Sequence, residues 1–143
     1  MIRLAILLLL FPLTAFAQGY SEPARGSVAR AALMDAIRPH AEWNFGTPVE
    51  FVAKDLRVSG AVGYASLSPQ RPGGARINLP STPLAKRGEI DPEFYEGVYM
   101  HVLYQKSGTT WVAVHWSIGA TDVWWADPEL CLIFRDVTPE ACY

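Results

Sequence analysis

Two histidines, His101 and His115, are the residues of this 143-residue chain whose type and spacing come nearest to metal chemistry. Each lies in a segment of alternating apolar and polar residues, and pairing these segments with His101 opposite His115 would bring the imidazoles together. A carboxylate from Asp122 or Glu96 would then complete a site for a small metal-dependent or hydrolytic enzyme. The spacing matches no metal motif such as His-Glu-x-x-His, and histidines on a half-exposed strand also occur as plain polar residues. We prefer the second interpretation and expect no bound metal.

Other arrangements that carry catalysis do not occur in the sequence, which has no Gly-x-Ser-x-Gly elbow and no phosphate-binding glycine loop. Asp122, Asp127 and Glu129 lie close together along the chain. A general acid and base also need a cleft and a defined separation, so we expect these carboxylates to solvate a loop. The sequence therefore predicts a protein that is not an enzyme and has no cofactor.

Adjacent tryptophans, Trp124 and Trp125, follow the last alternating segment. In an extended chain their rings point to opposite sides, which leaves one ring free to stack on a sugar or to anchor a partner. Packing in the core or over a sheet edge is the alternative and the more common role of tryptophan. If a ring is exposed, the predicted binding surface consists of Trp124, Trp125, Tyr99, His101, His115 and Asp122.

The two cysteines, Cys131 and Cys142, both lie in the last segment of the chain. Their separation differs from the Cys-x-x-Cys spacing of redox motifs, and no neighbouring Lys or His would activate either thiol. We therefore expect a structural disulfide. By the loop-entropy model, closing a ring of about 12 residues stabilises a fold by roughly 3 kcal/mol.

Residues 1–17 have the pattern of a cleavable secretory signal peptide, in which Arg3 precedes an apolar run from Leu4 to Phe11. Small residues in Ala15-Phe16-Ala17 predict cleavage before Gln18. The apolar run is shorter than the roughly 20 residues that span a bilayer, so we expect no membrane span in the mature chain. The predicted location is the periplasm or the medium, where a disulfide can form.

Length and charge limit the remaining possibilities. Residues 18–143 fit a single domain. The formal net charge is -2 and the charges are interspersed, whereas nucleic acids and anionic membranes are bound by clustered Lys and Arg. We therefore expect no nucleic-acid partner, and the sequence leaves the oligomeric state open.

The first element that must position these residues is a helix, with Ser27 as N-cap and apolar residues at helical spacing from Val28 to Ile37. Pro39 would kink or end this helix, or a further turn could follow as far as Gly46, a typical C-terminal glycine. Both endings stay open at this stage. In either case we expect the helix end, with His40 and Trp43, to pack on a sheet.

Segments 49–58 and 61–68 follow as a predicted β-hairpin, with Ser59-Gly60 as its turn. The small residues around Gly63 on one face indicate the close approach of the helix or of a ligand. Residues 69–97 are rich in Pro, Gly and charge and predict a long loop, in which Ile77 and Leu79 alternate briefly enough for one short strand.

Strict alternation over 98–105 and 112–118, interrupted at Ser107-Gly108-Thr109, predicts a second hairpin. A three-residue loop would place Met100 opposite Trp116, with every large even-numbered apolar residue on one face. The same register would place His101 opposite His115.

One helix followed by two hairpins resembles the helix-on-sheet architecture of cystatin-like and nuclear-transport-factor-like domains. Locally, segments 35–39, 48–52 and 119–124 look like those of small exported proteobacterial proteins with no assigned function. This resemblance implies an α+β fold with one kinked N-terminal helix packed on a roughly four-stranded antiparallel sheet. It implies no catalytic residues.

The function that these expectations favour is a periplasmic, non-catalytic binding module. Its partner would be an envelope protein or an envelope glycan, bound through loop 69–97 and the aromatic residues near Trp124.

Overall fold

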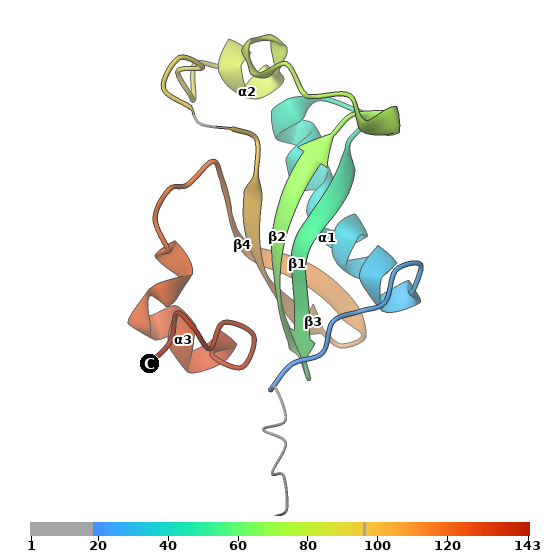
Figure 1. Cartoon of the computed structure of the whole chain (residues 1–143), viewed down its shortest axis with the longest axis vertical. Helices are drawn as coiled ribbons and strands as arrows, with labels where there is room; N and C mark the ends of the chain where they lie inside the picture. Colours follow the sequence, from blue (N-terminus) through green and yellow to red (C-terminus); the bar gives the residue numbers. More distant parts are fainter. Residues whose placement is uncertain (1–18, 96) are drawn as a thin grey trace, which may run out of the picture.

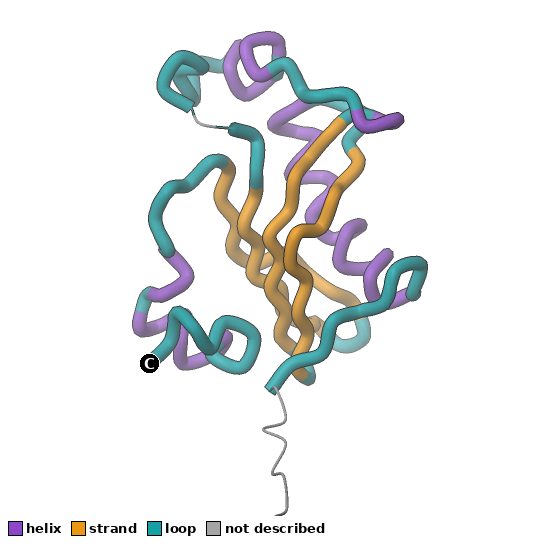
Figure 2. The backbone as a smooth tube through the Cα atoms, in the orientation of Figure 1, coloured by secondary structure: helices purple, strands orange, loops and turns teal. Residues whose placement is uncertain are grey.

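The computed structural model describes residues 19–95 and 97–143, which form a four-stranded antiparallel sheet and three α-helices (Figures 1 and 2). The strands are β1 (Glu50–Ser59), β2 (Val62–Gln70), β3 (Met100–Ser107) and β4 (Thr110–Ile118), paired in the order β1-β2-β3-β4. The expected α+β class is thereby confirmed. The predicted signal peptide, residues 1–17, lies outside the described residues.

Helix α1 (Val28–Phe45) runs through Pro39 and ends at Gly46, so the longer of the two predicted endings is correct. Ser27 caps its start by accepting a hydrogen bond from the Arg30 amide at 3.2 Å. Of the two residues expected to pack on the sheet, His40 does so, with its ring 5.3 Å from the Trp116 ring, centroid to centroid. Trp43 does not, since 69% of its surface is exposed. Ile37, Ala41 and Phe45 recur every four residues on the buried face of α1. Trp43 lies midway between Ala41 and Phe45 along the chain, so its side chain points away from that face.

The α1 side of the sheet holds the larger core. Leu33, Ile37 and Phe45 from the helix pack with Met100 and Tyr104 from β3, and all five side chains are buried. The close approach predicted at Gly63 is that of α1, because a β-carbon at Gly63 would lie 3.6 Å from Leu33 Cδ2.

The second hairpin forms, but the predicted register is wrong. Met100 pairs with Ile118, and His101 pairs with Ser117 instead of His115. A two-residue turn replaces the three-residue loop, and a bulge shifts the pairing after Leu103. The two-residue turn places Trp111 and Ala113 on the buried face in place of Val112 and Val114. The bulge then returns the even-numbered Trp116 and Ile118 to that face, a change that strict alternation cannot foresee.

Residues 71–99 connect β2 to β3 where the loop 69–97 was predicted, since β2 itself extends to Gln70. Three short helical turns interrupt it: η1 (Pro72–Gly74), η2 (Leu79–Ser81) and α2 (Pro83–Lys86). The expected short strand at Ile77 and Leu79 is wrong. Pro80 and Pro83 cannot donate to a strand ladder and suit the first turns of η2 and α2.

The chain after β4 folds against the other side of the sheet, so that α1 and α3 lie on opposite sides (Figure 1). It contains η3 (Trp124–Ala126) and α3 (Pro128–Phe134), and the predicted Cys131–Cys142 disulfide joins α3 to the C-terminal residues. Helix α3 was not predicted from the sequence. The signal was present in Asp127-Pro128-Glu129, where the Asp127 carboxylate accepts from the Glu129 amide at 2.9 Å as an N-cap.

Candidate functional site

An aromatic cluster occupies the sheet face opposite α1 and contains several of the predicted binding residues. The Tyr64 hydroxyl and His101 Nδ1 form a hydrogen bond of 2.9 Å. The His101 ring lies 4.3 Å from the Trp125 ring, centroid to centroid, and Tyr99 meets it edge-on at 5.9 Å. The fold thus brings Tyr99, His101 and Trp125 together.

Burial sets the protonation of this cluster. It lowers the pKa of His101 below the ordinary 6.5, so the imidazole is neutral at neutral pH. Burial, with the nearby Asp55 and Glu140 carboxylates, raises the pKa of Tyr64, while Arg57 acts in the opposite direction. The hydrogen bond therefore joins the neutral imidazole of His101 to the neutral phenol of Tyr64, and the pair contributes packing and hydrogen bonding to the fold.

The two tryptophans are in the turn η3 and are not extended. Their rings stand at 89° to each other, 5.6 Å apart. Trp125 has 8% of its surface exposed and belongs to the small core with Tyr64 and Phe134. Trp124 is half-buried, and its indole N–H donates to the Ser117 hydroxyl at 2.6 Å. Both rings therefore cover the sheet.

Other members of the predicted surface lie apart from this cluster. His115 is exposed and meets Phe134 edge-on at 6.4 Å. Asp122 is exposed in the bend after β4, and Glu96 lies outside the described residues. Across residues 19–95 and 97–143, no three His, Cys, Asp or Glu side chains converge in a group that could hold a metal ion.

Arg57 fastens the C-terminal segment to this face, a role that sequence analysis did not anticipate. It donates to Asp55 at 3.0 Å on its own strand, and to Glu140 at 2.8 Å and the Val137 carbonyl at 3.1 Å. Burial by itself would lower the pKa of Arg57, but the bonds and charges of the two carboxylates outweigh it and raise the pKa. The guanidinium also lies over the Tyr20 and Tyr64 rings, at 4.8 and 5.4 Å.

A groove of about 520 Å³, here called the loop groove, lies where the connection 71–99 meets the end of β2. Pairing between β2 and β3 stops at Leu67–Met100, and Pro69, which has no N–H to donate, follows. The groove floor is apolar and continuous with the α1-side core through Ile77, Leu79 and Val98. Its polar lining residues are Ser68, Gln70 and Arg76.

Tyr95 fixes one wall of the loop groove. Its hydroxyl donates to the Ile118 carbonyl at 2.7 Å, and burial raises its pKa, so the phenol keeps its proton. The ring rests on Gly119, where a β-carbon would lie 2.5 Å from the Tyr95 ring. Only glycine fits there, and its φ of 61° also favours glycine.

Two arginines tie the connection to the end of α1. Arg71 donates to the Phe45 carbonyl at 2.6 Å and to the Pro48 carbonyl at 2.9 Å. Arg87 donates to the Trp43 carbonyl and to the Asn44 side chain, both at 3.1 Å. The connection is thus bonded to the fold at several points.

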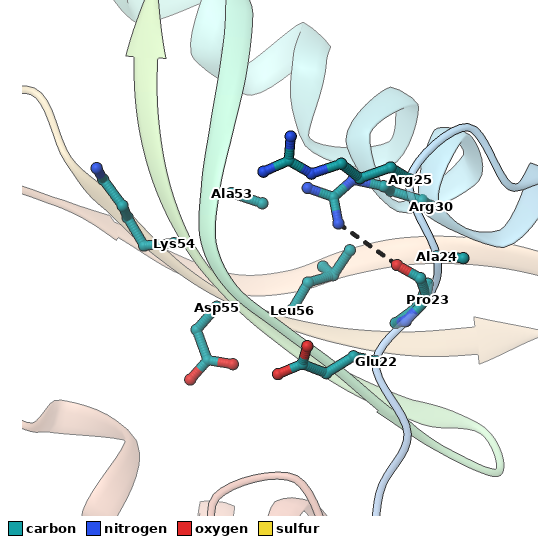
Figure 3. Close-up of a pocket in the computed structure, with 9 residues that line it drawn as sticks. All are labelled: Glu22, Pro23, Ala24, Arg25, Arg30, Ala53, Lys54, Asp55 and Leu56. Carbon is teal, nitrogen blue, oxygen red and sulfur yellow. Dashed lines mark hydrogen bonds between the residues drawn. The ribbon is translucent and has the colours of Figure 1, made fainter.

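A second hollow of about 310 Å³, the charged crevice, lies between the segment before α1, the start of α1, and β1 (Figure 3). Leu56 and Ala53 lie at its centre. Arg25 and Arg30 extend on one side, whereas the Glu22 and Asp55 carboxylates lie on the other (Figure 3). Both hollows join residues far apart in the chain, which explains why sequence analysis missed their shape.

Comparisons with models of protein families, with curated proteins and with solved structures found no match. No helix in the described part of the chain has the length and apolar character needed to cross a membrane.

Proposed function

We propose that this chain is a non-catalytic periplasmic module that binds a short apolar segment of an envelope protein in the loop groove. The observation that carries the proposal is the groove itself, about 520 Å³ with an apolar floor and few polar groups. Sites for small ligands span roughly 300–1,000 Å³ and combine an apolar lining with a few placed polar groups.

The lining favours a peptide over a glycan, the other partner expected from the sequence. Sugars stack on open aromatic faces, and the Tyr95 ring rests on Gly119. Apolar side chains would contact Ile77, Leu79 and Val98, and an acidic residue would complement Arg76, which is exposed at the groove.

The location and the fold relationship belong to the same proposal. Export by cleavage before Gln18 agrees with the Cys131–Cys142 disulfide, which is compatible with an oxidising compartment. The intact mass of the protein from a periplasmic fraction checks it, because the retained leader would show as the mass of the full chain.

A helix across a four-stranded sheet supports a cystatin-like or nuclear-transport-factor-like relationship as a proposal of architecture.

Selection from a displayed random-peptide library tests the binding site. We expect peptides with neighbouring apolar residues and an acidic residue. Arg76→Glu should change the selected charge from acidic to basic, and Leu79→Asp should weaken the selected peptides at least about tenfold.

Leu132→Asp is the matched control, because Leu132 is an exposed leucine on α3, outside the lining of the loop groove. It should bind the selected peptides like the wild type. Peptides that bind Arg76→Glu and Leu79→Asp unchanged, or that lose binding equally to Leu132→Asp, would contradict the proposed site.

A further inference from the structure

The charged crevice separates its charges in a way that points to a ligand. In Figure 3 the Arg25 and Arg30 guanidinium groups lie on one side, and the Glu22 carboxylate lies on the other. Among residues 19–95 and 97–143, neither Arg25 nor Glu22 forms an ion pair or a side-chain hydrogen bond. Within the same described residues, the Arg30 guanidinium donates only to the Pro23 carbonyl, at 3.4 Å.

The second carboxylate in the crevice is already neutralised. Asp55 is bound by Arg57, with 2.5 Å between Oδ2 and Nη2. Lys54 belongs to the lining but extends away from the two arginines (Figure 3). Two guanidinium groups and one carboxylate, facing each other across an apolar centre, are therefore the groups that a ligand would meet.

We propose that the charged crevice binds a small zwitterion, with its anionic oxygens on Arg25 and Arg30 and its primary ammonium on Glu22. Guanidinium groups bind carboxylates and phosphates through parallel N–H donors, and a carboxylate accepts from an ammonium group. A simple anion would leave Glu22 facing like charge, and a simple cation would face both arginines. The volume of about 310 Å³ is at the small end for ligand sites.

Free amino acids and ethanolamine phosphate share this chemistry, the second also as a lipid headgroup. The site does not depend on the loop groove, because it lies at the opposite end of α1 from α2 and its connection (Figure 1).

Calorimetric titration of the exported protein tests the proposal with L-alanine, O-phosphoethanolamine, acetate, inorganic phosphate and ethylammonium. At least one zwitterion should bind about tenfold more tightly than the single-charge probe with the same anionic group. Binding to vesicles that contain phosphatidylethanolamine would identify a lipid headgroup as the ligand, whereas binding of the free probes alone would identify a free zwitterion. Phosphatidylcholine vesicles are the control, because a quaternary ammonium cannot donate a hydrogen bond.

Two variants test the anionic end and the ammonium end of the ligand separately. Arg25→Gln should weaken both the zwitterion and its anionic analogue, whereas Glu22→Gln should weaken only the zwitterion, down to the level of the anion. Lys86→Gln, an exposed cation outside the crevice, should change neither. Equal affinity for the zwitterion and the anion, unchanged affinity in Glu22→Gln, or no binding of any probe would overturn the proposal.

Discussion

The two sides of the sheet are held by different kinds of contact. On the α1 side, large apolar residues such as Leu33, Ile37 and Phe45 interlock with β3. The small core on the other side contains Tyr64, Leu103, Trp125, Phe134 and Val137. Around this core, directional interactions hold the C-terminal segment in place. They are the hydrogen bonds of Arg57, the Tyr64–His101 and Trp124–Ser117 hydrogen bonds, and the disulfide.

This difference follows from area. A long helix presents a wide apolar stripe, and burial stabilises by about 25 cal/mol for each Å² of apolar surface removed from water. Helix α3 has seven residues and cannot offer a stripe of that size. The C-terminal side should therefore respond more strongly than the α1 side to reduction, to loss of a hydroxyl and to acid.

Removal of the disulfide should have the largest effect. Cys131→Ser with Cys142→Ser should lower the free energy of unfolding by about 3 kcal/mol, because the unfolded chain regains the freedom that the ring removes. Chemical denaturation measures this value, and amide hydrogen exchange should show faster exchange in α3 than in α1. A loss spread evenly over both helices would mean that the two sides do not differ in this way.

The same substitution on the two sides should have opposite signs. Tyr104 is buried on the α1 side, and its hydroxyl has no hydrogen-bond partner among the described residues. Tyr104→Phe should raise the free energy of unfolding by about 1 kcal/mol, whereas Tyr64→Phe should lower it by about 1 kcal/mol by removing the bond to His101. Thermal and denaturant unfolding compare the pair directly, and equal signs would refute the contrast.

Acid should have the smallest effect and act on the C-terminal side. Because burial lowers the pKa of His101, the unfolded chain binds a proton at a higher pH than the folded chain does. The contribution of neutral His101 to the free energy of unfolding is fully present above about pH 6.5, and it falls as the pH decreases toward the folded-state pKa. His101→Asn should reduce this pH dependence, and His115→Asn, at an exposed position, serves as its control.

An NMR titration of the imidazole signals provides the direct measurement. The His101 signal should move with a midpoint below 6.5. A midpoint above 6.5 would show that the neutral form is not the one that the cluster stabilises.

Local patterns predicted the elements of this fold well. Apolar spacing and the Ser27 cap located α1, alternation located all four strands, and the late cysteines predicted the disulfide. Helix α3 was missed although Asp127-Pro128-Glu129 carried its signal, because a short helix has little periodicity to detect.

The contacts within the candidate sites were harder to predict from the sequence. Strict alternation and a three-residue loop paired His101 with His115, and the two-residue turn together with the bulge after Leu103 changed that pairing. The adjacent tryptophans would point to opposite sides in an extended segment, but the turn η3 directs both rings to the sheet, the covering role that is the more common one for tryptophan. Residues of the loop groove and the charged crevice come from separate parts of the chain, so no local spacing relates Arg76 to Tyr95 or Glu22 to Arg30.

By itself, the sequence determined the type and order of helix α1 and the four strands, since periodicity, caps and turn residues act over a few positions. Tertiary structure decided the register of the second hairpin, the side of the sheet that each tryptophan covers, and the two hollows. A bulge and a packed turn depend on which side chains fill the space between distant elements. Which side chains fill that space is decided only when the sheet and the helices pack together.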